Sequence, residues 1–289
     1  LARMDSLTKD KSGIVGHSNL SQRSIATPQH SHPKMMYSTG ACTTPNYTDT
    51  KAGALGKFNH SYGGLIVEVA DDRFHVRQLV AMENGSFCDL LHEFTPEEVR
   101  LAKRPLSLTM GDTHWVKIDP EVQEATFNSM LPTLKPHHLI WHDLLDQYAR
   151  NHHHRKDWMV QYRKHHLVQD DVETEVNATL QALIDNTPDD CQSVVVSSNH
   201  DQALKRWLIE EDYRLDPRNA KFHNKLTGMM MDLMAETNYE DIDPFIMYGR
   251  GFIPDEIKNI KFLDSDESFM LGAVEYSQHG DKGTDGSRG

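Results

Sequence analysis

Hydrophobic and polar positions in the first third of the chain follow a strand-like order. Between residues 33 and 94, short runs of apolar and β-branched residues stand between polar segments. Such runs predict β-strands, and they cover residues 34–38, 64–69 and 73–79. Residues 1–32 are rich in Ser, Thr, Gln and His and show neither a helical nor a strand period. We therefore predict an extended arm or linker over 1–32 and a small β-rich N-terminal unit over 33–94.

The pattern changes after residue 94. Thr95-Pro96-Glu97-Glu98 has the composition of a helix start, with a capping hydroxyl, Pro at the first helical position and acidic residues in the first turn. Beyond it, apolar runs at 106–110, 138–141, 193–196 and 269–276 alternate with stretches of helical period at 119–133, 171–186 and 202–236. This order is typical of an α/β layer. We predict one α/β core over residues 95–289.

Composition narrows the function classes. The chain has 30 Lys and Arg against 43 Asp and Glu, a net charge of −13. This charge argues against a protein that coats a polyanion along its whole surface, but it is compatible with a local basic patch. Three scattered cysteines predict no disulfide framework and a reducing, cytoplasmic compartment. No apolar run approaches the ~20 residues of a membrane helix, and there is no signal-peptide pattern. The 18 histidines raise the expectation of a metal site.

Side chains that can bind a metal ion follow each of the four apolar runs. They are Asp112 and His114, then His142, Asp143 and Asp146, then Asn199, His200 and Asp201, and finally His279. Ligands bind at the carboxyl ends of the strands in open α/β sheets, so we expect these four ends to converge. The strand period of two also directs Asp112 and His114 to the same face.

The mixture of carboxylate, imidazole and amide oxygen suits Mn²⁺, Fe, Zn²⁺ or Mg²⁺. A carboxylate such as Asp143 can bridge two cations. Two metal ions about 3.5–4 Å apart form the clamp used for in-line displacement at phosphorus. The residues therefore favour phosphoester hydrolysis.

The order of these segments resembles the motifs of the calcineurin-like metallophosphoesterases. The likeness covers roughly residues 105–289 and implies a β-sandwich flanked by helices. It further implies two divalent metal ions, with Mn²⁺ favoured. In that family pattern Asp112 and His114 would bind the first metal, Asp143 would bridge, and Asn199 and His279 would bind the second. His200 would stabilise charge at the scissile phosphate or protonate the leaving oxygen, with Asp201 orienting its ring.

The chain departs from the family pattern in three respects. His142 and Ser198 stand where the family has Gly, and the fifth motif, which supplies one His to each metal, is absent from the sequence. The chain opens without Met and stops in a Gly-rich loop, so we expect a longer protein that supplies two more histidines after Gly289. The closing loop, together with residues 37–40 and 49–53, resembles a tailed-phage subgroup of the family associated with destruction of host DNA.

Residues 150–166 contain five Lys and Arg, five His and only one acidic residue, with Trp158 and Tyr162 between them. Aromatic rings among cations suit base stacking and phosphate contact. We therefore predict a nucleic-acid interface made by Arg150, His152, Arg155, Lys156, Arg163 and Lys164. A solvated helix face is the alternative interpretation of this segment. The three histidines at 152–154 are also compatible with a third metal site.

Together these features predict a dinuclear-metal DNase, phage-encoded and acting on host DNA in the cytoplasm of an infected bacterium, without a membrane association. A metallophosphatase acting on a nucleotide, a phosphoprotein or a small phosphoester is the first alternative. The second is a non-catalytic takeover or assembly protein that retains the fold. The basic residues at 150–166 favour DNA over a small substrate, and the intact ligand set argues against a non-catalytic protein. The sequence is compatible with a homo-oligomer.

Overall fold

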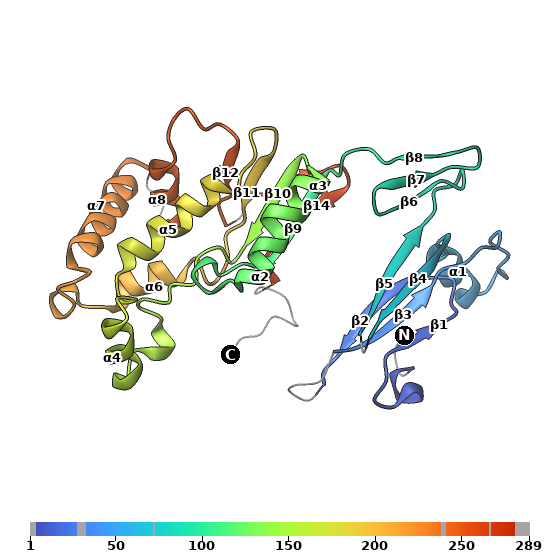
Figure 1. Ribbon diagram of the computed structural model, residues 1–289, viewed down its shortest axis with the longest axis horizontal. Coiled ribbons are helices and arrows are strands. Elements are labelled where there is room, and N and C mark those ends of the chain that lie inside the picture. Colours follow the sequence, from blue (N-terminus) through green and yellow to red (C-terminus); the bar gives the residue numbers. More distant parts are fainter. Residues whose placement is uncertain (1–3, 28–32, 72, 238–240, 266, 281–289) are drawn as a thin grey trace. The chain divides into compact units, whose positions relative to one another are not determined.

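The computed structural model describes residues 4–27, 33–71, 73–237, 241–265 and 267–280 (Figure 1). The chain divides into two compact units, unit 1 up to Lys103 and unit 2 from Arg104 onward. Each unit has its own sheets, and each is described here by itself. No helix among the described residues is long and apolar enough to cross a membrane.

Unit 1 begins with a three-stranded sheet in the order β1-β3-β2. Its strands are β1 (Gly13–Val15), β2 (Leu20–Ile25) and β3 (Lys34–Thr39), with β1 parallel and β2 antiparallel to β3. The prediction of an arm or linker over 1–32 therefore does not describe residues 13–25. No residue of β2 is buried and its middle is exposed, which suits its polar residues, whereas β3 carries the buried Met36 and Tyr37.

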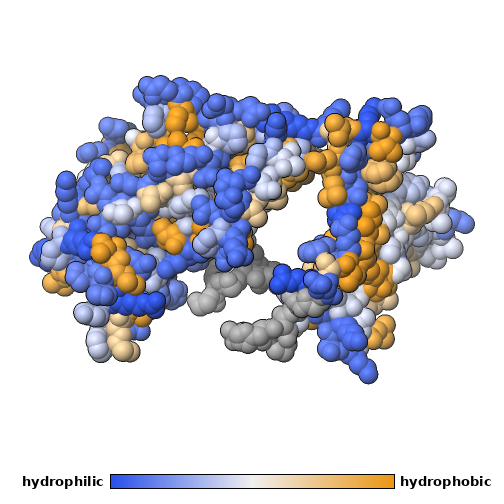
Figure 2. All heavy atoms as spheres, in the orientation of Figure 1, coloured by the Kyte–Doolittle hydropathy of each residue, from blue (hydrophilic) through white to orange (hydrophobic). Residues whose placement is uncertain are grey.

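The rest of unit 1 consists of a long hairpin, a small sheet and one helix. The predicted strands at 64–69 and 73–79 are β4 (Gly63–Ala70) and β5 (Arg73–Val80), an antiparallel pair. The small sheet contains β6 (Phe87–Asp89), β7 (His92–Phe94) and β8 (Val99–Leu101), and the helix is α1 (Lys51–Phe58). Figure 2 shows apolar side chains exposed over the strands of this unit.

The helix start predicted at Thr95 is a turn between β7 and β8. The Thr95 hydroxyl accepts the backbone N–H groups of Glu97 and Glu98 at 3.3 and 3.0 Å, as an N-cap would. After this turn the chain continues as strand β8, and Phe94 before the turn pairs with Val99 after it. This hairpin carries unit 1 beyond the predicted boundary at residue 94.

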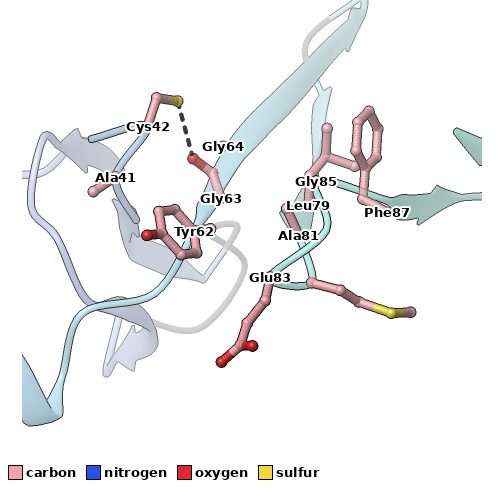
Figure 3. A pocket seen from close by; sticks show the side chains of 11 residues that line it. Ala41, Cys42, Tyr62, Gly63, Gly64, Leu79, Ala81, Glu83, Gly85 and Phe87 are labelled. Carbon is pink, nitrogen blue, oxygen red and sulfur yellow. Dashed lines mark hydrogen bonds between the residues drawn. The ribbon is translucent and has the colours of Figure 1, made fainter. Parts of the chain in front are cut away.

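Unit 1 also contains a pocket of about 510 Å³ next to the start of β4 (Figure 3). Its lining is mainly apolar and backbone, from residues such as Ala41, Leu79 and Phe87, with the Cys42 thiol pointing toward the Gly63 carbonyl. Glu83 is the charged residue of the lining. The pocket offers no group of metal ligands.

The central element of unit 2 is a parallel sheet in the order β12-β11-β10-β9. Three of the predicted runs supply β9 (Ser107–Asp112), β10 (His138–His142) and β11 (Gln192–Val195). The fourth prediction, a strand over 269–276, is wrong. The fourth strand is β12 (Ile260–Phe262), and residues 269–276 form a small hairpin of β13 (Met270–Leu271) and β14 (Val274–Glu275).

The two faces of this sheet are covered differently. Leu139, Trp141 and Val195 belong to one apolar core together with the helices, whereas Ile140 and Val194 face a second core capped by Phe269 and other residues of the hairpin. The alternation follows from the strand period of two. The helices are α2 (Pro120–Gln123), which continues through 124–130 into α3 (Leu131–Leu134), then α4 (Trp158–His166), α5 (Val172–Asp185), α6 (Ala203–Glu210), α7 (Ala220–Thr237) and α8 (Pro244–Phe252). Unit 2 is therefore an α/β fold, as predicted.

Candidate metal centre

The segments that follow β9 and β10 are joined by backbone hydrogen bonds. The N–H groups of Thr113, His114 and Trp115 donate to the carbonyls of residues 142, 143 and 144 at 3.1, 2.8 and 3.1 Å. His114 and Asp143 both adopt left-handed backbone conformations, with φ of 41° and 45°. Such conformations are costly for residues other than Gly and cluster at functional sites. Here they turn both side chains toward the same place.

Two groups of ligands share Asp143. Asp112, His114 and Asp143 each offer one ligand atom, and these three atoms lie within 4.8 Å of one another. On the other side, His279 Nε2 lies 3.0 Å from Asn199 Oδ1 and 3.4 Å from Asp143 Oδ2. The five predicted metal ligands are therefore adjacent, although the run before His279 is not a strand of the sheet.

These side chains line a cleft of about 440 Å³. Its lining residues are Met110, Asp112, His142, Asp143, Asn199, His200, Gln278, His279 and Gly280. Asp112 and Asn199 are exposed, whereas the Asp143 side chain is 4% exposed. The cleft thus has a buried carboxylate at its base and polar groups at an open rim.

One buried oxygen of the Asp143 side chain indicates whether these residues fit a metal ion. Asp143 Oδ1 is buried and has no hydrogen-bond partner among the described residues. A buried carboxylate oxygen without a partner is costly in a folded protein, and a cation removes that cost. Together with the imidazole and amide donors around it, this oxygen fits a hard divalent metal ion.

A third group lies beside the first. His114 Nδ1 is 3.3 Å from Asp146 Oδ1, and the rings of His114 and His200 contact each other edge-on with centroids 4.5 Å apart. One ligand atom from each of His114, Asp146 and His200 fits within 4.8 Å. The Asp146 carboxylate raises the pKa of His114. The sequence places Asp146 three residues after Asp143 and names it as a possible ligand, but it predicts no role for Asp146.

Asp201 does not orient the His200 ring. Its carboxylate is buried and accepts the Leu145 N–H and the Ser198 hydroxyl, both at 2.9 Å. No hydrogen bond joins Asp201 to the His200 imidazole within the described ranges. Burial raises the pKa of Asp201 well above its ordinary value. Asp201 therefore links the segment after β11 to the segment that carries Asp143, and Ser198 takes part in that link.

The predicted nucleic-acid interface is largely neutralised within unit 2. Arg150 makes a two-pronged ion pair with Asp216, at 2.6 and 2.8 Å, and its side chain is 18% exposed. Lys164 is fully buried, donates to the Tyr148 carbonyl and lies over the Tyr148 ring. Burial lowers the pKa of Lys164 to about 8. Lys164 is therefore out of reach of a bound strand, which corrects that part of the prediction, whereas Arg150 is partly exposed but paired.

The other four residues of the interface reach the surface. Arg155 pairs with Glu211 at 2.8 Å, and His152 Nε2 lies 2.8 Å from the Arg206 guanidinium. Lys156 and Arg163 are exposed, and no ion pair within the described ranges involves either one. Only these two cations of the predicted interface remain unneutralised.

Asp281 and the following residues up to Gly289 lie outside the described residues. His142, in contrast, lines the cleft with its ring 5.7 Å from that of His279. Burial lowers the pKa of His142. This residue stands where the metallophosphoesterase pattern has Gly, and the sequence named it as a possible ligand without giving it a role in the site.

Comparison with curated proteins finds a phage homologue. Protein A1 of Escherichia phage T5 is 32% identical to this chain over 285 residues. The match covers 95% of this chain but 51% of the phage protein, so the chain spans about half the length of that relative. No family model matches the sequence, and no solved structure matches it. The homologue agrees with the expected likeness to a phage protein.

Proposed function

We propose that this chain is a dinuclear-metal phosphodiesterase that hydrolyses DNA. The observation that carries the proposal is the position of Asp143, whose carboxylate belongs to two ligand groups at once. Asp112 and His114 would complete one metal site, and Asn199 and His279 the other. Mn²⁺ is the favoured ion, with Mg²⁺, Fe or Zn²⁺ as alternatives, because the donors are oxygen and imidazole.

The bound ions would neutralise charge on the phosphoryl oxygens as Lewis acids. His200 would hold a proton at its imidazole and deliver it to the leaving oxygen at the rim of the cleft. The Asp146 carboxylate lies beside this ring, since one ligand atom of each lies within 4.8 Å of the other. Asp201 would act indirectly, by fixing the segments that carry His200 and Asp143.

The site also supports a polymeric substrate. Its rim residues Asp112 and Asn199 are exposed, so a phosphodiester within a long chain can reach Asp143 without threading through the protein. The phage homologue supports a role in an infected host. Within the metallophosphoesterase resemblance, the narrower likeness is to a phage first-step DNA-transfer protein, which favours host DNA as the substrate and the host cytoplasm as the location.

The fold expected from the same likeness is a β-sandwich. We infer that the β13–β14 hairpin begins its second layer, because Phe269, Leu271 and Tyr276 already cover the face of the parallel sheet that the helices leave open. Ser107 on β9 also donates to the Tyr276 hydroxyl at 2.9 Å.

A small-substrate phosphatase is the second candidate. It is favoured by the ion pairs that neutralise much of the 150–166 segment, because a duplex-binding surface needs several free cations. The same ligand groups would serve a phosphomonoester.

Parallel assays separate the candidates. Purified protein is incubated with plasmid DNA, p-nitrophenyl phosphate and bis(p-nitrophenyl) phosphate, each with Mn²⁺, Mg²⁺ or chelator. We expect metal-dependent cleavage of DNA and of the diester, which chelator and Asp143→Ala abolish and which the exposed Asp232→Ala leaves intact. Cleavage of the monoester alone would favour the phosphatase. Inactivity on all three substrates, despite bound metal, would favour a non-catalytic protein.

A further inference from the structure

The exposed face of α4 is aromatic. Trp158 and Tyr162 are 75% and 67% exposed, and His166 is exposed as well. The three residues are spaced by four, so they lie in a row along one side of the helix. The rings of Tyr162 and His166 are 6.3 Å apart and nearly parallel, at 9°. We call these three residues the α4 aromatic row.

The α4 aromatic row stands on the segment that carries the candidate metal centre. From the inner side of α4, Lys164 donates to the carbonyl of Tyr148, two residues after Asp146. The His154 ring, just before α4, contacts the Tyr148 ring at 5.8 Å. His152 is tied to Arg206, which lies on the helix that follows His200. Helix α4 and the residues just before it therefore contact both the segment that follows Asp146 and the helix that follows His200.

The charges beside the row have the sign that a nucleic acid needs. Lys156 and Arg163 are exposed and make no ion pair with another described residue. Asp157, the single acid within residues 150–166, caps the helix by accepting the N–H groups of Met159 and Val160, both at 3.1 Å, while Glu210 and Glu211 pair with Arg155. Aromatic rings with a few cations bind unpaired bases by stacking and the backbone by charge.

We propose that the α4 aromatic row binds the unpaired bases of single-stranded DNA and leads that strand to the metal centre. The inference rests on the proposed function for the direction of the strand, but base binding itself does not require cleavage. Duplex DNA is disfavoured, because its base faces are covered by neighbouring bases and two free cations are too few for its phosphates. The substrate class is therefore a single strand, or a duplex end or gap.

Tryptophan fluorescence tests this directly. The chain has four tryptophans, of which Trp141 and Trp207 are buried and Trp158 is 75% exposed. The full chain is titrated in chelator with oligo(dT) and with a duplex of equal length. We expect oligo(dT) to quench the emission and to bind more tightly than the duplex. Trp158→Ala and Tyr162→Ala should each weaken oligo(dT) binding about 5- to 100-fold, measured by anisotropy of a labelled oligonucleotide.

Matched variants give the controls. Met159→Ala removes an exposed side chain of the same helix and should bind oligo(dT) like the native chain, whereas Trp158→Phe should restore most of the affinity. Equal affinity for duplex and oligo(dT), or no loss in Trp158→Ala, would overturn the proposal. So would a dimer in sedimentation that Trp158→Ala converts to a monomer, because the row would then be an interface between copies. Trp158-dependent binding without cleavage in Mn²⁺ would contradict the nuclease proposal only.

Discussion

Units 1 and 2 bury their apolar residues to very different extents. Met36 and Tyr37 are the only apolar residues of unit 1 that are buried among the described residues, whereas unit 2 has a core that joins its sheet to its helices. On the hairpin of unit 1, Val69 is 75% exposed, and Phe58 on α1 is 88% exposed. Unit 1 therefore depends on backbone pairing and ion pairs more than on burial.

The difference explains where the candidate chemistry lies. A parallel sheet covered on both faces holds its strand ends rigidly, and the candidate metal ligands follow three of those ends. The more exposed sheets of unit 1 hold no comparable group of possible metal ligands among the described residues. Four experiments test this contrast.

The largest expected effect is on catalysis. His200→Ala should slow phosphodiester hydrolysis by about 10²–10⁴, because a positioned proton donor contributes that much. Bound metal, measured by plasma mass spectrometry after desalting, should stay nearly unchanged. Asp143→Ala should lose both metal and activity, because Asp143 belongs to both ligand groups.

The matched substitution in unit 1 is His75→Ala, which removes an exposed imidazole. Its rate and metal content should equal those of the native chain. Equal metal loss in His200→Ala and Asp143→Ala would contradict the role of His200, and a slow His75→Ala would place part of the chemistry in unit 1.

The second experiment compares two aromatic stacks. Trp141 is fully buried and stacks on Phe127 with centroids 5.5 Å apart, whereas Phe94 in unit 1 is half-buried and stacks on Phe87 at 5.0 Å. Trp141→Ala should lower the free energy of unfolding of unit 2 by about 3–5 kcal/mol. Phe94→Ala should cost about 1–2 kcal/mol, because less area is buried.

Urea unfolding followed by circular dichroism measures both variants. Tryptophan fluorescence follows unit 2 separately, since all four tryptophans lie in it. A cost for Phe94→Ala that matches the cost for Trp141→Ala would show that unit 1 has a core of its own.

The sequence predicted the fold best where strands are buried. The runs at 138–141 and 193–196 match β10 and β11 because both faces of those strands are covered, so nearly every position is apolar. Strand β2 was missed because its middle, Ser-Gln-Arg-Ser, has no alternation of apolar residues. The Thr95 turn was missed for another reason. A helix cap and a turn use the same hydrogen bonds, and only the residues that follow distinguish them.

The sequence predicted which candidate ligands lie together, but it did not predict the contacts that hold their segments in place. Asp112, Asp143 and Asn199 converge because parallel strands end at one edge, a rule that needs only the order of elements. The partner of Asp201 depends instead on how two loops approach each other. Likewise, the cations of 150–166 were counted along the chain, while the acids that neutralise Arg150 and Arg155 lie more than fifty residues away.

The third experiment uses pH. Burial raises the pKa of Glu175 in unit 2 to about 7, although its carboxylate accepts the N–H groups of Tyr148 and Ala149 at 2.7 Å. The folded chain binds this proton more tightly than the unfolded chain. The free energy of unfolding of unit 2 should therefore fall as the pH rises from about 4.5 to 7, by up to about 3 kcal/mol from this group.

Glu175→Gln removes this contribution and leaves the other titratable groups in place. We expect urea unfolding, followed by tryptophan fluorescence at pH 5 and 7.5, to show a smaller pH dependence in the variant. The neighbouring Lys164, whose pKa is lowered to about 8, acts mainly above this range. The shifted groups of unit 1, which are Arg77, Glu93 and Arg100, titrate outside it. An unchanged slope in Glu175→Gln would contradict the raised pKa.

The smallest effects come from a matched pair of isosteric substitutions. Val195 on β11 is 0% exposed, and Val69 on β4 is 75% exposed. Val195→Thr places a hydroxyl in the core and should cost about 1–3 kcal/mol of unfolding free energy, whereas Val69→Thr should change it by less than about 0.5 kcal/mol. Urea unfolding by circular dichroism, repeated at two protein concentrations, measures both. A cost of more than about 1 kcal/mol for Val69→Thr would mean that the hairpin face is covered in solution. If that cost also grew with protein concentration, a second copy would be the cover, and the exposed apolar residues of unit 1 would be an interface rather than a surface.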